Sequence, residues 1–585
     1  LSTYGGVSCM HLPQSPRPIT WIDPAPIPTT VELDSLHPNP VISRLLYRRG
    51  IRDHQSATAF LSHRPQAAPD PYMLPNLRAA VERVSQAIDN GERIGIFGDY
   101  DVDGVTSTAL LVLALRAATD RERISSYLPD RTQGYGLNLA GIDELHGNGA
   151  TLLITVDCGS NDQEQVAYAQ SRGMDVIILD HHRISGDTPV GALTVSPQLL
   201  PSPCSYHDLT GVGVAYLLIS TLAQHGYPVE EREDAQETSF LDLVALGTVA
   251  DVAPLHGINR CLVRDGLAVL SATSRPGLKA LMRNASVTPQ MVTATDISFG
   301  LAPRMNAPGR MSSPQLAFDL LLSESVQEAE QLAQALEVVN TRRQAQTEVV
   351  IGEAHAMIAR LPNWQERPLI ALERPTWPAG LLGAVASRLQ EELHRPIFLF
   401  RNDDGILHGS ARSVPGFDLV NALGEVDSLL IRYGEHSQAA GITLEDVQLD
   451  HLRDAFAEMI EDQGLEIPLP PSIVLDEVLT GSDVTPDLVR SMHAMEPFGS
   501  GNPSPMFRID NARVLRYSTM GKDNTHLRIT LQVGQRQVTA VQWSAAHRSR
   551  ELVEGRQLDV AGHLELNSWQ GQERLQIMLK DFRVS

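Results

Sequence analysis

Between residues 76 and 260 the spacing of hydrophobic residues changes repeatedly between short continuous runs and a helical period, which predicts alternating strands and helices. Short apolar runs bounded by polar turns predict buried strands at 94–98, 152–157 and 175–180. Apolar positions three or four residues apart predict helices near 76–90, 104–118 and 162–172. Because parallel strands need crossovers of this kind, the alternation is typical of an α/β unit built on a parallel sheet.

The remaining pattern divides the chain into further segments. Residues 314–361 are rich in Gln, Glu, Ala and Leu and carry few helix breakers, which predicts one long helix. After a proline-rich linker, short alternating strands with Gly and Asn turns predict a small β-barrel such as an OB-fold. We expect five segments in order: a flexible tail at 1–39, N-terminal helices and the α/β unit at 40–313, the connecting helix at 314–361, a smaller α/β unit at 362–466 and the barrel at 467–585.

The composition is that of a globular protein with several cores, since 42% of the 585 residues are hydrophobic and 20% are charged. No apolar run reaches the ~20 residues that a membrane helix needs, and the N-terminus lacks the pattern of a signal peptide. The four cysteines lie far apart without a Cys-x-x-Cys pair, which argues against a disulfide framework and a structural zinc site. We therefore expect a cytoplasmic protein with no membrane contact.

The formal charge of −23 argues against a nucleic-acid partner, because proteins that bind nucleic acids usually carry a basic face. Bound cations and a few local arginines can still supply a positive field at one site. The charge thus lowers non-specific affinity without excluding a nucleic-acid substrate.

Residues 98–104 read Gly-Asp-Tyr-Asp-Val-Asp-Gly and directly follow the first predicted strand. Three carboxylates at alternate positions point to one side, and they repel one another unless a cation neutralises them. Further acidic and imidazole side chains also close hydrophobic runs: Asp157, Asp180, His181, His182 and Asp251. Since open α/β sheets bind ligands at the carboxyl ends of their strands, we expect these side chains to converge.

The candidate metal ligands combine four carboxylates with one imidazole, a mixture that suits Mn²⁺ or Mg²⁺. They are Asp101, Asp103, Asp157, His181 and Asp251. We expect two ions about 3.5–4 Å apart with Asp157 as the bridge, an arrangement that prepares water for attack on a phosphoryl group. His182 completes the candidate catalytic set as a donor to the scissile phosphate or the leaving oxygen. Asp99 and Asp180 would orient the ligands.

The order of these motifs resembles that of the DHH phosphoesterase superfamily, and further segments resemble its RecJ family of single-strand-specific DNA exonucleases. The superfamily resemblance rests on residues 98–104, 157, 180–182 and 245–255. The RecJ resemblance rests on Gln-Gly-Tyr-Gly-Leu at 133–137, Leu-Ala-Pro-Arg-Met-Asn-Ala-Pro-Gly-Arg-Met at 301–311, Gly-Ser-Ala-Arg-Ser-Val-Pro-Gly-Phe at 409–417 and Pro-Phe-Gly-Ser-Gly-Asn-Pro at 497–503.

This resemblance implies a DHH domain, a long connecting helix, a DHH-associated domain and an OB-fold. It implies Mn²⁺- or Mg²⁺-dependent hydrolysis of single-stranded DNA from 5′ to 3′, releasing mononucleotides in recombination and repair. Single-stranded DNA is the implied partner, and a single-strand-binding protein and a helicase are further candidates. A monomer is our default expectation.

The resemblance also assigns substrate contacts. Two guanidinium groups and a hydroxyl suit a terminal phosphate, and the implied 5′-phosphate pocket consists of Arg131, Ser410 and Arg412. Contacts to the DNA backbone are implied for Arg304, Asn306, Arg310 and His436. Trp543 and Trp569 are candidates for base stacking, although an isolated tryptophan in a small barrel more often belongs to the core.

Three positions depart from the family pattern. Glu435 stands where the family has glycine, and Pro378 stands where it has histidine. Phe97 lies four residues before Asp101, where some relatives place a metal-binding histidine. Glu435 puts a phosphate contact in question, and Pro378 puts a polar contact in question. Phe97 puts the binding strength of one ion site in question.

Two other functions stay open at this point. A phosphodiesterase of the same superfamily would act on short oligonucleotides or cyclic dinucleotides, but the barrel at 467–585 counts against it. A catalytically inactive scaffold would bind single strands without needing the five candidate ligands.

Overall fold

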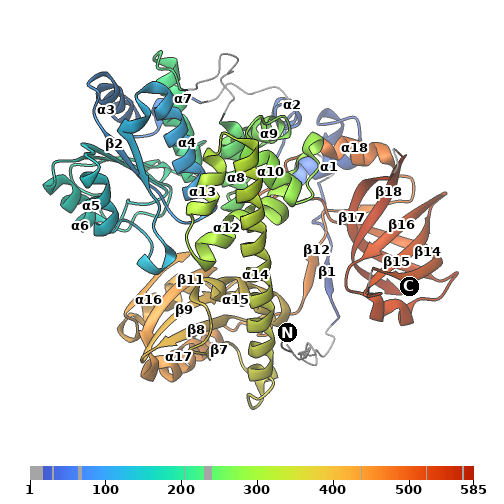
Figure 1. Ribbon diagram of the computed structural model, residues 1–585. Coiled ribbons are helices and arrows are strands. Elements are labelled where there is room, and N and C mark those ends of the chain that lie inside the picture. Colours follow the sequence, from blue (N-terminus) through green and yellow to red (C-terminus); the bar gives the residue numbers. More distant parts are fainter. Residues whose placement is uncertain are drawn as a thin grey trace.

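A computed structural model gives the structure of residues 18–28, 32–62, 69–202, 204–229, 240–436, 438–521, 523–569 and 572–584. Within these ranges, no helix combines the length and the hydropathy needed to cross a bilayer. Figure 1 shows an α/β unit at the upper left, a second α/β unit below it and a barrel at the right.

The first α/β unit contains a five-stranded parallel sheet in the order β3-β2-β4-β5-β6. Its strands are β2 (Ile94–Phe97), β3 (Ile124–Tyr127), β4 (Leu152–Val156), β5 (Asp175–Leu179) and β6 (Leu193–Val195). The helices of this unit are α3 (Leu77–Asp89), α4 (Val102–Ala118), α5 (Leu139–Gly147), α6 (Gln163–Ser171) and α7 (Gly211–Gln224). The predicted strands and helices are confirmed. The strand order reverses beside β2, which places a ligand crevice at the carboxyl ends of β2 and β4.

A group of helices extends this unit: α8 (Leu241–Ala250), α9 (Gly257–Ser271), α10 (Pro276–Asn284), α11 (Ala294–Asp296) and α12 (Ala302–Met311). The segment expected to be one long helix holds two, α13 (Gln315–Leu322) and α14 (Val326–Ile358). The prediction of a continuous helix is wrong because Ser325 caps α14 by accepting a hydrogen bond from the Glu328 amide. α14 passes from the first α/β unit to the second (Figure 1).

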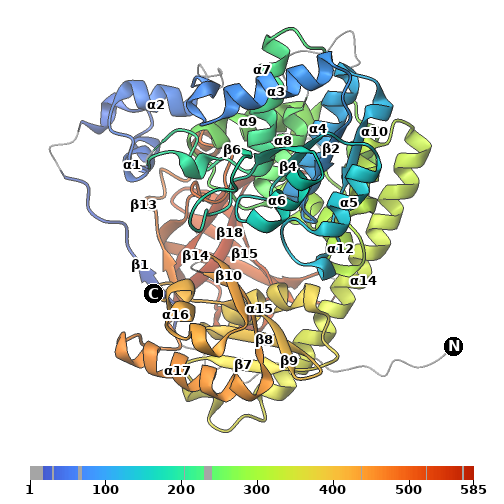
Figure 2. The same cartoon turned by 90° about the vertical axis from the view of Figure 1, so that its left-hand side faces the viewer.

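The second α/β unit has a mixed sheet in the order β10-β11-β9-β8-β7, in which β7 and β8 are parallel. Its strands are β7 (Ile370–Glu373), β8 (Ile397–Asp403), β9 (Ile406–Arg412), β10 (Arg432–His436) and β11 (Ala439–Glu445). Its helices are α15 (Ala379–Leu393), α16 (Leu419–Glu425) and α17 (Leu449–Asp462). In Figure 2 this unit lies directly below the first.

The C-terminal unit is the expected barrel. It closes because β14 pairs with both β15 and β17, while β16 and β18 complete the ring. Its elements are β13 (Glu477–Leu479), α18 (Pro486–His493), β14 (Phe507–Met520), β15 (His526–Val533), β16 (Arg536–Gln542), β17 (Gln557–Trp569) and β18 (Gln572–Val584).

The N-terminal residues are attached to the barrel side of the molecule. Residues 1–17 of the expected flexible tail lie outside the described residues, but β1 (Thr20–Ile22) pairs in parallel with β12 (Ser472–Val474). The Trp21 indole donates a hydrogen bond to Asp581 at 2.8 Å. Apolar residues of α1 (Pro40–Arg48) share a core with the barrel, and α2 (His54–Leu61) packs beside them. This part of the tail is therefore ordered by contacts with residues more than 400 positions away, which local periodicity does not reveal.

Candidate metal centre

The acidic loop 98–104 ends in the first turn of α4. Asp101 caps this helix by accepting a hydrogen bond from the Gly104 amide at 3.1 Å. Asp103 is 1% exposed and accepts hydrogen bonds from the amides of Gly211 at 2.7 Å and Val212 at 2.9 Å. These amides begin α7, so the positive end of a helix stabilises and orients the Asp103 carboxylate.

Asp157 follows β4 and is also buried. Its φ of +62° lies in the left-handed region, which aspartate tolerates better than most residues. A Cβ atom at Gly211 would lie only 2.8 Å from the Asp157 Cβ and 3.1 Å from Oδ2 of Asp103. Glycine at 211 therefore allows the carboxylates of Asp103, in α4, and Asp157, after β4, to approach each other.

The imidazoles are placed by Asp180, a buried residue at the end of β5. One of its oxygens accepts hydrogen bonds from the amides of His181 at 2.8 Å and His182 at 3.1 Å. The same oxygen lies 2.8 Å from Nδ1 of His182. His181 is thereby directed inward, and its Nε2 lies 3.1 Å from Asp157 and 3.8 Å from Asp251.

The structure thus brings together the five candidate ligands from four separate segments. Their ligand atoms fall into three overlapping groups, each within 4.8 Å, among the residues that the structure describes: Asp157, His181 and His182; Asp103, His181 and Asp251; and Asp99, Asp101 and Asp157. Asp157 and His181 each belong to two groups, and Asp157 is the carboxylate of the two, as a bridging position requires. His182, to which the sequence assigns the role of a donor, also lies in one group. Asp99, to which the sequence assigns an orienting role, lies among the possible ligands. The ligand assignment itself remains a prediction.

Burial, and after it mutual repulsion, raises the pKa values of four of these carboxylates. Burial and then the charges of Asp103 and Asp101 raise the pKa of Asp157 well above its usual range. Burial and Asp101 raise that of Asp103 to about 7, although its two amide hydrogen bonds oppose the shift. Burial followed by neighbouring carboxylates also raises the pKa values of Asp99 and Asp251. Divalent cations would remove this repulsion, so the donor set fits hard cations such as Mn²⁺ and Mg²⁺.

Asp180 differs from these carboxylates, because its pKa is lowered while that of its partner His182 is raised. Burial alone would raise the pKa of Asp180, but the hydrogen bond and charge of His182 hold it well below its usual range. Burial opposes the charged imidazole of His182, yet Asp180 and the other carboxylates raise its pKa to about 9. The short contact with Asp180 favours the protonated form of the His182 imidazole.

Predicted phosphate contacts lie beside the carboxylates. The Arg131 guanidinium lies 4.3 Å from the ring centroid of Tyr100, which is a residue of the acidic loop. Arg412 donates to Ser410 at 3.2 Å. Burial and then the charges of Arg131, Arg343 and Arg412 lower the pKa of Arg310 to about 10. The two lobes thus place several guanidinium groups near one another, in a chain whose net charge is strongly negative.

Among the predicted contacts to the DNA backbone, Arg304 already has a partner within the protein. Arg304 forms an ion pair with Glu337 of α14 at 2.5 Å, so its guanidinium is engaged within the protein because α12 packs on α14. Asn306 is half-buried on α12. The side chains of His436, Glu435 and Trp569 lie outside the described residues.

The exposure of Trp543 and the burial of Phe97 decide whether each side chain belongs to a core. Trp543 is 57% exposed, so the alternative that it belongs to the barrel core is wrong. The His526 ring meets it edge-on at 4.6 Å, and base stacking stays a prediction. Phe97 is fully buried against Tyr127, with ring centroids 5.2 Å apart. Its side chain belongs to the core and fills no ligand position.

Sequence reasoning missed three contributors to this site: the helix amides at 211–212, Arg343 and Tyr135. The Tyr135 ring lies 5.0 Å from that of His182, and its hydroxyl donates to the Asp157 carbonyl at 3.4 Å. The motif at 133–137 contained this tyrosine. Thr210 followed by glycines signalled the start of α7, because threonine is a common helix cap.

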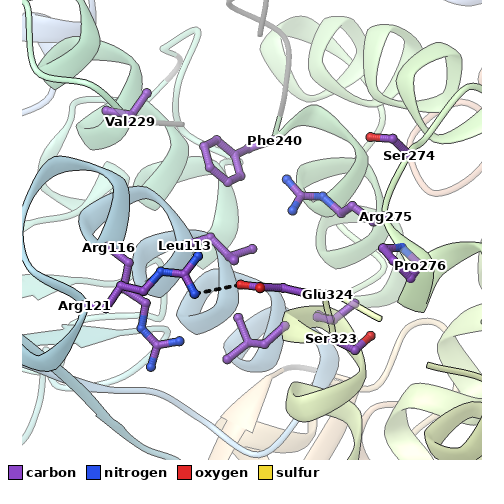
Figure 3. A pocket seen from close by; sticks show the side chains of 12 residues that line it. Leu113, Arg116, Arg121, Val229, Phe240, Ser274, Arg275, Pro276, Ser323 and Glu324 are labelled. Carbon is purple, nitrogen blue, oxygen red and sulfur yellow. Dashed lines mark hydrogen bonds and ion pairs between the residues drawn. The ribbon is translucent and has the colours of Figure 1, made fainter. Parts of the chain in front are cut away.

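A separate cavity of about 450 Å³ lies at the other end of α4 (Figure 3). Arg116 lines it from the last turn of α4, about 20 Å along the helix from Asp103. Arg121 and Glu324 meet across it at 2.8 Å. This ion pair connects the turn that follows α4 to the α13–α14 junction, and the cavity is distinct from the candidate metal centre.

Comparisons with known proteins match all three units. The models of the DHH family N-terminal domain, the DHHA1 domain and the RecJ OB domain match residues 93–248, 366–462 and 475–581. The single-stranded-DNA-specific exonuclease RecJ of Bacillus subtilis is 33% identical over 555 residues, which cover 94% of this chain and 69% of that protein. The protein of that name from Salmonella typhimurium is 32% identical over 568 residues, which cover 94% of this chain and 97% of that protein.

Solved structures agree with these relatives. The crystal structure of RecJ from Thermus thermophilus in complex with Mn²⁺ has a TM-score of 0.81 and 29% identity, covering 97% of this chain and 80% of that chain. The structure of the same protein with Mg²⁺ has a TM-score of 0.75 and 29% identity, covering 97% and 79%.

Proposed function

The chain belongs to the RecJ family of single-stranded-DNA-specific exonucleases, and we propose on this premise that it hydrolyses single-stranded DNA from the 5′ end, releasing mononucleotides. The observation that carries the proposal is the convergence of five candidate ligands at the carboxyl ends of β2, β4 and β5 and at the end of α8, next to guanidinium groups from both lobes. The carboxylates suit cations, and the guanidinium groups suit the phosphates of a nucleic acid.

The candidate ligands fit Mn²⁺ or Mg²⁺ as the cofactor. When bound, such ions polarise a phosphoryl oxygen and lower the pKa of an attacking water. The residues of the chain supply the remaining functions. His182 is held by Asp180 at 2.8 Å, a contact that favours the protonated imidazole and suits it to donate a proton to the leaving oxygen. The α7 amides keep Asp103 oriented throughout.

The direction of cleavage follows, in this proposal, from a 5′-phosphate pocket made by Arg131, Ser410 and Arg412. Arg412 is fixed by its donation to Ser387 at 2.9 Å and to Ser410 at 3.2 Å. A guanidinium group held in this way binds a terminal phosphate in one orientation. The terminal phosphate would then determine which linkage reaches the candidate ligands.

The test of the function compares substrates of the same sequence. A 40-nucleotide single strand labelled at its 5′ end should release labelled mononucleotide from the first time point. The blunt duplex and the dinucleotide should react at least tenfold more slowly. Earlier release of labelled mononucleotide from a matching strand labelled at its 3′ end, or equal rates on duplex and single strand, would contradict the proposal.

Replacement of Arg412 by alanine should weaken the preference for a 5′-phosphate over a 5′-hydroxyl end by about tenfold to a hundredfold, the usual effect of losing hydrogen bonds to a charged group. The measurement is kcat/KM on the two kinds of end. Arg401→Ala is the matched control, because Arg401 pairs with Asp403 on the neighbouring strand β8. An unchanged preference in Arg412→Ala would reject the pocket.

We also propose that the protein acts in recombination and repair, as a monomer in the cytoplasm. A single-strand-binding protein and a helicase are the partner candidates. The closed barrel and the exposed Trp543 beside His526 support a polymeric rather than a dinucleotide substrate, because stacked aromatic groups can hold successive bases.

A further inference from the structure

The segment Pro-Phe-Gly-Ser-Gly-Asn-Pro at 497–503, here termed the docking loop, lies just before the first long strand of the barrel but contacts the first α/β unit. The docking loop contacts the turn at residues 252–256, here termed the ligand turn. This turn directly follows Asp251. The Leu255 amide donates a hydrogen bond to the Ser500 carbonyl at 2.7 Å. A segment almost 250 residues away thus touches the backbone beside a candidate metal ligand.

The ligand turn begins with an unfavourable conformation. Val252 has a φ of +61°, in the left-handed region that a β-branched residue rarely adopts. Its side chain is 70% exposed, so its own burial does not hold it there. Backbone strain of this kind persists only where surrounding contacts determine the conformation. At the end of α8, the amides of Val252 and Ala253 donate to the carbonyls of Val249 at 3.2 Å and Thr248 at 3.4 Å. Contacts from outside the turn add to these local hydrogen bonds in keeping Asp251 near Asp103 and His181.

The docking loop fits closely against the ligand turn. A Cβ atom at Gly499 would lie 2.7 Å from Cδ1 of Leu255, a side chain that is 2% exposed. A Cβ atom at Gly501 would lie 3.1 Å from Cβ of Pro254. The two glycines thus allow the loop backbone to lie directly on the turn.

Buried polar groups fix the docking loop in place. Asn502 is 3% exposed and donates to the carbonyls of Met495 at 2.9 Å and Pro497 at 2.8 Å. Its side-chain oxygen accepts a hydrogen bond from Arg49 at 3.0 Å. Arg260, 5% exposed on α9, donates to the Pro497 carbonyl at 3.4 Å. The loop is therefore tied both to the N-terminal helices and to the helix that follows the ligand turn.

We propose that the docking loop positions Asp251: by holding the strained ligand turn, it keeps this carboxylate in place for a divalent cation. The inference rests on the proposed function, in which Asp251 is a ligand. It assigns Gly499, Ser500 and Asn502 as positioning residues that act on the metal centre through the ligand turn, without contacting metal or DNA.

The test measures Mn²⁺ binding by electron paramagnetic resonance of the unbound ion, together with thermal unfolding. Asn502→Ala should weaken the affinity of one Mn²⁺ site at least tenfold. Asn39→Ala is the matched control, because Asn39 caps α1 in the same part of the molecule without contacting the ligand turn. It should lower the Tm and leave Mn²⁺ affinity within twofold of wild type. Wild-type affinity in folded Asn502→Ala would overturn the inference.

Two further variants keep the test decisive if Asn502→Ala does not fold. Gly499→Ala displaces Leu255 and should weaken Mn²⁺ binding at least threefold, whereas Gly147→Ala, where a Cβ meets nothing within 4 Å, should not. Equal affinity in the two glycine variants would overturn the inference.

A rescue variant tests the role of strain. Asparagine adopts the left-handed region more readily than valine, so Val252→Asn should restore most of the Mn²⁺ affinity lost in Asn502→Ala. Absence of rescue would contradict the role assigned to the strained turn. If wild-type protein binds no Mn²⁺, the proposed function fails as well. If wild-type protein binds Mn²⁺ and the variants bind it with the same affinity, this inference alone fails.

Discussion

Replacement of Asp157 by alanine is expected to abolish hydrolysis, with a loss of kcat on the order of a thousandfold or more, because a bridging carboxylate contributes several kcal/mol through the cations that it holds. Asp157 belongs to two of the three groups of ligand atoms, and His181 lies 3.1 Å from it. Loss of this carboxylate would therefore disturb both candidate ion positions at once.

The fold should survive the substitution. Asp157 faces other carboxylates that raise its pKa, so removing it relieves repulsion. Its φ of +62° makes alanine somewhat strained, and Asp157→Asn is the control that keeps the shape and suits this backbone conformation. Single-turnover kinetics, with circular dichroism to confirm folding, provide the measurement. Activity within tenfold of wild type in either variant would refute the bridging role.

Removal of divalent cations with EDTA should stop hydrolysis completely, and added Mn²⁺ should restore it. Without cations, several buried carboxylates repel one another, as their raised pKa values indicate. Cation binding should therefore also stabilise the fold, by about 2.7 kcal/mol at a free concentration one hundred times Kd.

Activity assays and thermal unfolding with and without Mn²⁺ measure both effects. DNA binding by gel shift serves as the control, because a scaffold that only binds single strands would keep this property in EDTA. Turnover that persists after elemental analysis shows the metal to be gone would contradict the account.

The strands of the first sheet could be predicted where both faces are buried. β2, β4 and β5 read as continuous apolar runs, since helices cover the sheet. β3 was missed because this edge strand carries two serines among four residues. The break between α13 and α14 was missed although Ser325 and Glu328 form the Ser-x-x-Glu pattern of a helix start, because the helix-favouring composition on both sides outweighed this short signal.

The convergence of Asp157 and His181 could also be predicted, because the carboxyl ends of parallel strands meet at one edge of the sheet. The partners of Asp103 could not, since its amide donors come from a helix more than 100 residues away. Likewise, the pairing of Arg304 with Glu337 depends on the packing of α12 against α14, which spacing along the chain does not reveal.

The position of the cations tests the central claim most directly. Crystals grown with Mn²⁺ and measured at the manganese absorption edge should show two anomalous peaks beside the Asp157 carboxylate, about 3.5–4 Å apart. One peak should lie toward Asp103, His181 and Asp251 and the other toward Asp99 and Asp101. No peak at saturating Mn²⁺, or peaks that avoid Asp157, would contradict the account.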